Sequence, residues 1–183
     1  ALGIEAASER VRNDVEKGYD QQDIYRAIGR IRSAGSSIVA NYIFGLPEDD
    51  ASSMQETLSL ACSLNAEYSN FYCTMAYPGS ALYTQALQQG WPLPTTWSGY
   101  SQHSKDSLPL PTRHLSSKQV LEFRDHAFQR YFNHPDYLNM MTKRFGDETV
   151  AHIRNMAGHR LVREASARSI PEASPKHTPN TSP

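Results

Sequence analysis

Three short apolar segments alternate with helical segments over the first 90 residues, and this order constrains the fold more than any other feature. The segments are ALGIE, SSIVANYIF and YSNFYCTMAYP, all rich in aliphatic or aromatic residues. The second and third are typical of strands that are buried on both faces. Because strands that alternate with helices usually lie parallel, we predict an α/β chain with a parallel sheet covered by helices.

Start and stop signals place helices between these segments. Ser8 is expected to cap a helix that ends at Gly18, and a second helix is expected from Asp20 to Gly35. A third begins near Asp50, and a fourth follows the turn PGS. The strands and helices therefore predict the order β-α-α-β-α-β-α.

The chain divides by composition into four parts. Residues 1–90 carry the alternating elements, and residues 91–115 form a connecting loop rich in Pro, Ser and Trp. Residues 116–165 are predicted to form a helical extension, whose aromatic side chains are expected in the core: Phe123, Phe128, Tyr131 and Phe132. Residues 166–183 have almost no large apolar side chains and are expected to be disordered.

The strand ends are the best candidates for a ligand site. Parallel α/β folds bind ligands beyond the carboxyl ends of their strands, and the stretch NYIFGLPEDD spans one such end. Gly45 leaves room for a ligand to approach the backbone. Either Glu48 or Asp50 is expected to cap the helix that follows. Glu5 and the sequence AYPGS end the other two strands, so we expect a site at their shared edge.

Together these segments resemble a known enzyme family. The chain from GIEAASERVRNDVEKG through NYIFGLPEDD to YCTMAYPGSALY is similar to the second half of the radical S-adenosylmethionine (SAM) core barrel. It is most similar to the branch whose members often carry an N-terminal cobalamin-binding domain. The resemblance implies a partial (β/α) TIM-type barrel over residues 1–90, followed by a helical C-terminal extension.

The resemblance also implies roles for individual residues. Glu5 matches the position that contacts the SAM ribose, and Ile43 and Gly45 match the GxIxGxxE element that flanks the adenine. The backbone near Ala76 and Tyr77 matches a further adenine contact. The family's pattern differs here in Asn41, which replaces the first glycine of GxIxGxxE, and in the AA that follows Glu5, where Ser-Gly is common.

The cluster-binding motif of the family is absent from this sequence. Radical SAM enzymes hold a [4Fe–4S] cluster with a CxxxCxxC loop, and the two cysteines here, Cys62 and Cys73, lack that spacing. We expect both to be small buried residues, and we assign no catalytic or metal-ligating residue to the chain. The resemblance thus implies an inactive fragment that needs the N-terminal half of the same polypeptide. The edge of the strand Leu2–Glu5 is expected to be unpaired without it.

The full enzyme would cleave SAM reductively to a 5′-deoxyadenosyl radical, for methyl transfer or other C–H functionalisation of a small-molecule metabolite. SAM and the cluster are the expected cofactors, with cobalamin as a third that the branch suggests. Tyr100, His103 and Arg113 are candidates to line a substrate pocket. The spacing of the histidines in the sequence does not match that of metal ligands, so it gives no support for a metal site.

Two alternatives remain open from the sequence. A radical SAM methylthiotransferase acting on RNA would carry a basic C-terminal domain, whereas this C-terminal part is near neutral. The second alternative is a non-catalytic half barrel that binds a nucleotide or a partner protein. The net charge of −1 gives no support for a nucleic-acid partner, and no apolar run approaches the roughly 20 residues that a membrane span needs. A cytoplasmic location is therefore expected.

Overall fold

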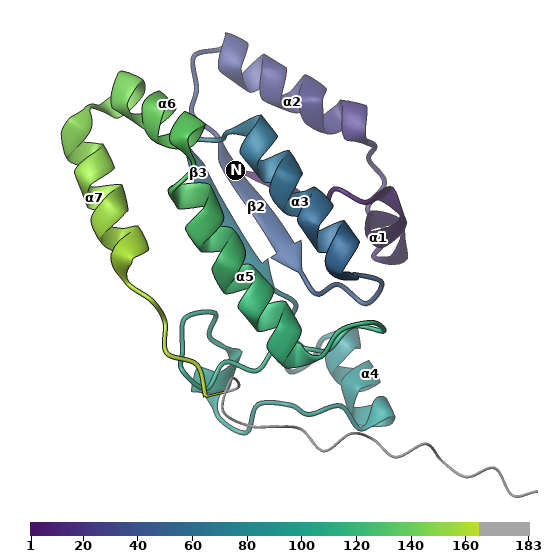
Figure 1. Ribbon diagram of the computed structural model, residues 1–183. Coiled ribbons are helices and arrows are strands. Elements are labelled where there is room, and N and C mark those ends of the chain that lie inside the picture. The colour runs from purple at the N-terminus through teal and green to yellow at the C-terminus, as the bar shows by residue number, and fades with distance from the viewer. Residues whose placement is uncertain (165–183) are drawn as a thin grey trace, which may run out of the picture.

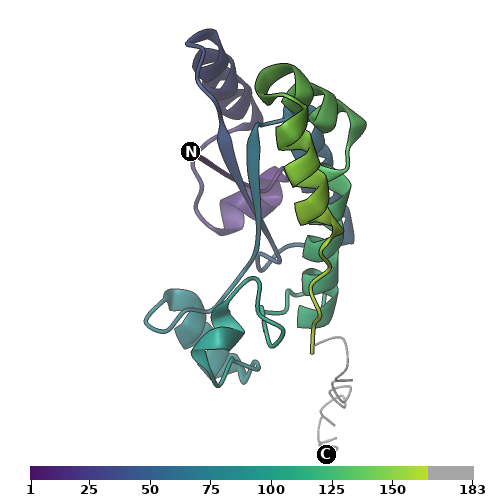
Figure 2. The ribbon, with the colours of Figure 1, turned by 90° about the vertical axis from the view of Figure 1, so that its left-hand side faces the viewer.

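The computed structural model describes residues 1–164 (Figures 1 and 2). Its strands are β1 (Leu2–Glu5), β2 (Val39–Phe44) and β3 (Tyr68–Cys73). Its α-helices are α1 (Glu9–Asp14), α2 (Gln21–Ser33), α3 (Ala51–Leu64), α4 (Ala81–Gln89), α5 (Ser117–Phe132), α6 (Pro135–Phe145) and α7 (Asp147–Gly158), and a short 3-10 helix, η1 (Trp97–Tyr100), precedes α5. The order β1-α1-α2-β2-α3-β3-α4 confirms the prediction for residues 1–90. The tail that we predicted to be disordered lies outside the described residues.

The three strands form a parallel sheet in the order β1-β2-β3. Asn41 of β2 is in register with Gly3 of β1 and with Asn70 of β3. The register shifts between Gly3 and Glu5, where β1 ends. The predicted α/β class with a parallel sheet is therefore confirmed, whereas three adjacent strands do not by themselves establish a barrel.

Helices cover one face of this sheet. Figure 2 shows α5 and α7 on one side of the strands, and Figure 1 shows α3 and α5 crossing in front of β2 and β3. Side chains on that face, such as Tyr42 and Phe71, are buried, but on the opposite face Tyr68 and Tyr72 are exposed. The prediction that these strands are buried on both faces is wrong for β3, because its residues alternate strictly between buried and exposed.

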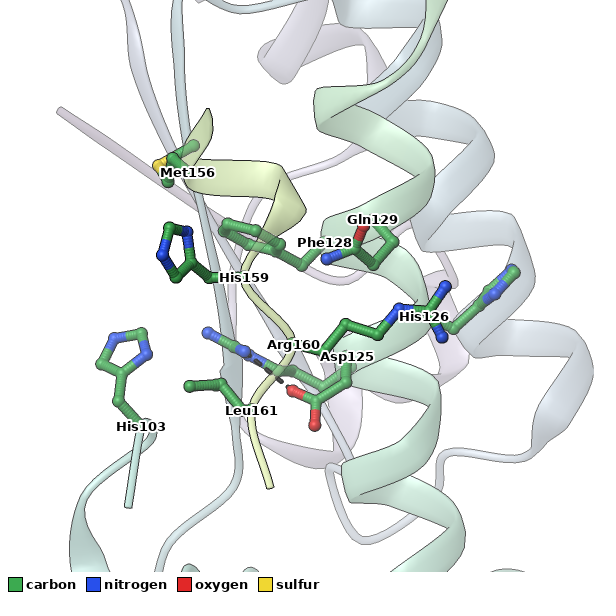
Figure 3. Close-up of a pocket in the computed structure, with 10 residues that line it drawn as sticks. His103, Asp125, His126, Phe128, Gln129, Met156, His159, Arg160 and Leu161 are labelled. Carbon is green, nitrogen blue, oxygen red and sulfur yellow. Dashed lines mark hydrogen bonds and ion pairs between the residues drawn. The ribbon is translucent and has the colours of Figure 1, made fainter. Parts of the chain in front are cut away.

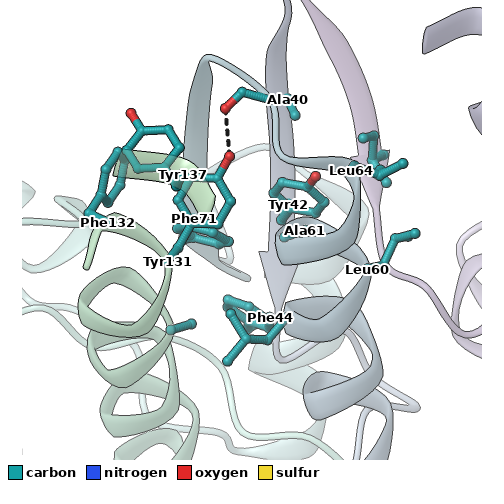
Figure 4. Close-up of a cluster of buried hydrophobic side chains, with 14 of the residues drawn as sticks. Ala40, Tyr42, Phe44, Leu60, Ala61, Leu64, Phe71, Tyr131, Phe132 and Tyr137 are labelled. Carbon is teal, nitrogen blue, oxygen red and sulfur yellow. Dashed lines mark hydrogen bonds between the residues drawn. The ribbon is translucent and has the colours of Figure 1, made fainter. Parts of the chain in front are cut away.

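Aromatic side chains from the sheet and from α5 make the centre of the core (Figure 4). Phe71 stacks on Tyr42 and on Phe44, with ring centroids 5.4 Å and 5.9 Å apart. Tyr131 of α5 packs its ring edge against Phe71 at 5.4 Å and donates a hydrogen bond of 2.6 Å to the Ala66 carbonyl. The predicted aromatic stripe of α5 is thus confirmed as core, and the helical extension shares one core with residues 1–90.

Capping residues set most helix boundaries as predicted. Asp20, Asp50 and Ser116 each form a capping box at the start of α2, α3 and α5. Asp50 is therefore the cap of α3, and Glu48 is not. Ser80 caps α4, and Gly90 ends it in the left-handed conformation.

The first helix differs from the prediction. Ser8 occupies the N-cap position of α1, but its side chain makes no capping hydrogen bond. The helix ends at Asp14 rather than at Gly18, because Val15 leaves the helical conformation and Glu16 adopts a φ of 57°. The left-handed residue that ends this turn is a glutamate, which a search for a C-terminal glycine misses.

Side chains close the outer edge of β3. The amide of Gln102 accepts from the Cys73 backbone nitrogen at 2.8 Å and donates to the Cys73 carbonyl at 3.0 Å. Arg124 Nε donates to the Phe71 carbonyl at 2.9 Å on the same edge. These contacts replace the hydrogen bonds that a further strand would make, so they stop the sheet from growing beyond β3.

No helix among residues 1–164 combines the length and the apolar character that crossing a bilayer requires.

Candidate ligand-binding site at the carboxyl edge of the sheet

Glu5 lies where β1 ends and is held there by a bent backbone. Its φ of 59° turns the side chain back over Gly3, where an added Cβ would lie 2.7 Å from Glu5 Oε1. Glu5 Oε1 pairs with Lys17 Nζ at 3.1 Å, and the side chain is 12% exposed. The second carboxylate oxygen accepts no hydrogen bond from residues 1–164. Glu5 therefore offers one acceptor oxygen to a ligand hydroxyl at this edge.

Tyr19 supports Glu5 from the segment between α1 and α2. Its hydroxyl donates to the carbonyls of Gly3 at 2.9 Å and Ile4 at 3.0 Å. Burial, and then the negative charge of Glu5, raise the pKa of Tyr19 to about 12. The hydroxyl is therefore a proton donor at neutral pH, and it fixes the backbone from which Glu5 projects.

Gly45 has a packing role at the end of β2. Its φ is 80°, and a Cβ at this position would lie 2.5 Å from Val120 Cγ1 of α5. The space that we assigned to a ligand is thus filled by Val120. Ile43 sits on the other face of the sheet and packs against the small cluster of Ala6, Val11 and Leu46. That both residues flank an adenine stays a prediction.

A buried carboxylate organises the turn after β2. Asp49 is 1% exposed, and its Oδ2 accepts from the backbone nitrogens of Gly45 at 3.0 Å and Leu46 at 3.1 Å. Ser53 Oγ donates to Oδ1 at 2.6 Å. Burial raises the pKa of Asp49, against the lowering effect of these hydrogen bonds. The two backbone N–H groups are committed to Asp49, so a ligand at this edge must use other groups.

Glu48 has a structural role in the same turn. It forms ion pairs with Arg10 of α1, at 3.3 Å, and with Arg113 of the connecting loop. The Arg113 backbone nitrogen also donates to the Pro47 carbonyl at 3.0 Å. The connecting loop is therefore fastened to the end of β2.

The end of β3 carries an aromatic pair. Ala76 is buried against Ala86 and Leu110, whereas Tyr77 is half exposed and stacks on Tyr100 with centroids 5.8 Å apart. The loop is held here too, because the Leu110 backbone nitrogen donates to the Thr74 carbonyl at 3.0 Å. Tyr100 and Arg113 thus reach the strand edge; that they line a substrate pocket stays a prediction. His103 does not line this edge; it lies in a separate pocket with Arg124.

The open face of the sheet adds polar groups that the sequence reasoning missed. Asn70 Nδ2 donates to Asn41 Oδ1 at 2.9 Å across β2 and β3. Both residues alternate with the buried Tyr42 and Phe71, so they lie on the face of the sheet opposite to these side chains. The strict alternation in YSNFYC was the signal that places Asn70 on the uncovered face.

The cysteines do not suit an iron–sulfur cluster. Cys73 is buried in the sheet, and burial raises the pKa of its thiol to about 12. Burial also raises the pKa of Cys62 in α3. Cys62 in α3 and Cys73 in β3 also lack the CxxxCxxC spacing of a cluster loop, so the pair does not fit that role. Residues 1–164 hold no group of three or more His, Cys, Asp or Glu side chains placed to bind a metal ion.

Comparison with known proteins gives one informative similarity. No family profile matches the sequence. A protein of Pyrococcus horikoshii that is described as an uncharacterized methyltransferase is 25% identical to this chain over 137 residues. The matched region makes up 75% of this chain but 29% of that protein, so the chain spans about three tenths of its relative's length.

Proposed function

We propose that the chain is part of a SAM-dependent methyl-transfer enzyme and contributes the ribose and adenine side of the SAM site. Two observations support methyl transfer with SAM: the similarity to a methyltransferase, and a strand edge that carries Glu5, Ile43 and Tyr77. The observation on which the proposal chiefly rests is the Glu5 carboxylate, bent over β1 with one oxygen available.

In this proposal, different residues of the chain contact the ribose and the adenine of SAM. Glu5 would accept hydrogen bonds from ribose hydroxyls, while Lys17 and Tyr19 keep its carboxylate in place. Ile43 offers an apolar surface on the open face, and Tyr77 with Tyr100 offers an aromatic one. Stacking on such a surface suits a flat heterocycle such as adenine.

We further propose radical SAM chemistry, on the resemblance of the strand ends to that family. In that chemistry a [4Fe–4S] cluster supplies the electron that cleaves SAM, and cobalamin is a second group that the branch would use. Because Cys62 and Cys73 do not fit a cluster, its ligands would belong to a different part of the polypeptide. Nothing in residues 1–164 is assigned to the reacting atoms themselves.

The partner in this proposal is the N-terminal half of the same protein. Gln102 and Arg124 close the β3 edge, so the sheet can be extended only beside β1. A pocket of about 200 Å³ lies there, lined mainly by apolar atoms of Leu2, Ile4 and Ile24. Ile4 and Ile24 are already buried, so an additional strand beside β1 would chiefly cover the partly exposed Leu2.

The test is a comparison of SAM binding and SAM cleavage by the full polypeptide under anaerobic, reducing conditions. 5′-Deoxyadenosine as a product supports radical chemistry. Methyl transfer with S-adenosylhomocysteine and no 5′-deoxyadenosine leaves a SAM methyltransferase and removes the radical step. Binding without either product favours the non-catalytic module, and no SAM binding overturns the whole proposal.

A matched pair of variants tests whether Glu5 binds SAM. Glu5→Gln keeps the size of the side chain but weakens acceptance from ribose hydroxyls. We expect its Kd for SAM to rise about tenfold, equivalent to about 1.4 kcal/mol. Glu9→Gln, an exposed change in α1, is the control. Equal affinities of the two variants would remove Glu5 from the site.

A further inference from the structure

A second pocket, of about 570 Å³, lies between α5, the end of α7 and the loop residue His103 (Figure 3). This volume is within the range of small-molecule sites. The pocket wall contains none of the residues that we assign to the SAM site. The proposed SAM site therefore does not account for this pocket.

Arg124 forms a buried cationic wall of this pocket. It is 3% exposed. Its Nε donates to the Phe71 carbonyl at 2.9 Å, and its Nη1 donates to Asp125 Oδ1 at 2.9 Å. Its Nη2 donates to no residue within 1–164. Arg124 lines the pocket, and Nη2 is not among the fully buried atoms that lack a partner, so this nitrogen is available to donate to a ligand in the pocket.

The charges around Arg124 favour an anion. Asp125 is the acidic residue of the pocket wall, and both of its oxygens are taken by Arg163, at 2.8 Å each. Arg124 shares one of these oxygens. Arg160 adds a further positive charge at the exposed rim. Three arginines against one neutralised aspartate leave an excess of positive charge.

Histidines stand at the pocket's entrance. Figure 3 shows His103 and His159 on the same side of the pocket, and His126 on another side. Burial, and then the charges of Arg124 and Arg163, lower the pKa of His103. Asp125 acts in the opposite direction and is outweighed. Burial is the largest cause, and the two arginine charges add to it; a bound anion would oppose the contribution of the arginines.

Apart from the amide of Gln129, the rest of the wall is apolar. Phe128, Met156 and Leu161 line it from α5, α7 and the segment after α7. The Phe128 ring also packs under Arg124, whose guanidinium carbon lies 5.6 Å from the ring centroid. A ligand for this space must therefore present an anionic group to Arg124 and an apolar body to the other side chains.

We propose that this pocket is a binding site for a small organic anion, an apolar or aromatic molecule that carries a carboxylate or phosphate group. Its head group accepts from Arg124 Nη2, between His103 and His159. Its body lies against Phe128, Met156 and Leu161.

Phenyl phosphate and benzoate are the probes, and benzyl alcohol is the neutral control. Each is titrated into the full chain while NMR follows the ring signals of His103 and His159 and the methyl signal of Met156. We expect saturable shifts at these three residues with at least one anion, and none with benzyl alcohol. The shifts should weaken as salt is added. The more tightly bound anion tells whether a phosphate or a carboxylate is preferred.

Two matched pairs of variants locate the site. Arg160→Glu should weaken binding at least fivefold, whereas Arg154→Glu, an exposed change on α7 outside the pocket wall, should leave it unchanged. His103→Ala is compared in the same way with His114→Ala, another exposed histidine of the connecting loop. All four positions are exposed, so the variants should fold.

A direct readout on His103 completes the test. Its pKa, measured by NMR titration, should rise when the anion is bound. Equal shifts with benzyl alcohol, equal affinities within both variant pairs, or the absence of saturable shifts at His103 and His159 would each overturn the proposal.

Discussion

Val120 of α5 occupies the place that a side chain at Gly45 would fill: a Cβ there would lie 2.5 Å from Val120 Cγ1. Gly45 also has a φ of 80°, which L residues rarely adopt. We predict that Gly45→Ala destabilises the fold by about 3 kcal/mol, through overpacking and backbone strain together. Urea denaturation measures this change.

Two comparisons separate overpacking from strain. Gly35→Ala, with φ 72° and no atom near the added Cβ, should show the strain alone and cost less. In the double variant Gly45→Ala with Val120→Ala, the effects should be non-additive by about 1 kcal/mol or more, because the smaller residue admits the methyl group. Strictly additive effects would mean that the contact with Val120 is not what requires glycine.

Asp49 is predicted to stabilise the turn by accepting two backbone hydrogen bonds. Asp49→Ala leaves the N–H groups of Gly45 and Leu46 buried without an acceptor, and should cost about 2–4 kcal/mol. Asp49→Asn keeps an acceptor oxygen and should cost much less. Chemical denaturation of the two variants distinguishes them; equal losses would contradict the role of this oxygen.

The same carboxyl group makes stability depend on pH. Because burial raises its folded pKa, the stability that Asp49 contributes is fully present below its unfolded pKa and falls as pH rises through the folded pKa. In Asp49→Asn this decline should be absent. Urea midpoints measured from the usual carboxyl pKa near 4 up to neutral pH should therefore converge or cross for the two proteins.

The sequence predicted those parts of the fold that depend on local pattern. Capping residues such as Asp50 and Ser116 act on their own helices, and the alternation of strands with helices sets the parallel sheet. Long-range packing was not predictable in this way. Nothing near Gly45 in the sequence indicates that a helix 75 residues later fills its space, and glycine near a strand end is consistent with a ligand as well as with close packing.

The candidate site was predictable only in its placement. Glu5 ends one strand and Tyr77 comes after another. Because parallel strands end at the same side of a sheet, both residues were expected at its carboxyl edge. The partners of these residues, Lys17 and Tyr100, come from distant segments that the sequence does not connect. The sequence pointed to His103 as a pocket residue but not to its neighbours in the anion pocket, because Arg124, His103 and His159 meet through tertiary packing alone.

The two cysteines should differ in reactivity. Cys73 is buried in β3, and burial raises its pKa to about 12, whereas Cys62 is partly exposed on α3. With a thiol reagent at mildly alkaline pH, Cys62 should react slowly in the native protein and Cys73 only on global unfolding. Mass spectrometry of the labelled peptides assigns each rate. Labelling of Cys73 at the rate of Cys62 would contradict its position in the core.

Glu67 is predicted to be the main polar link between α6 and the sheet. It is 2% exposed, accepts from the Ile38 backbone nitrogen at 2.8 Å and forms an ion pair with Arg144. Glu67→Ala leaves the Ile38 nitrogen unpaired and should cost about 3 kcal/mol. Glu56→Ala, on the exposed face of α3, should change stability by less than about 0.5 kcal/mol. If both variants changed the free energy of unfolding by this small amount, Glu67 would not be stabilising the fold.

Asp106 is predicted to hold the connecting loop in shape and to release it at low pH. Its carboxylate accepts from Ser98 at 2.6 Å, Thr96 at 3.1 Å and Ser104, and these hydrogen bonds lower its pKa to about 2, below the usual 3.8. The stability that it contributes is therefore present above pH 3.8 and is lost as pH falls through about 2. Trp97, next to Ser98, is largely exposed and reports on this loop by fluorescence.

The change in Trp97 emission should follow this window in the unmodified chain. In Asp106→Asn, whose amide cannot accept from all three hydroxyls as a carboxylate can, the low-pH spectrum should already be present at neutral pH. Trp91→Phe removes the second tryptophan, so that the emission comes from Trp97 alone. A spectrum that is unchanged in Asp106→Asn would mean that the hydroxyl contacts do not order the loop. Its order would then depend on the attachments of Leu110 to Thr74 and of Arg113 to Pro47.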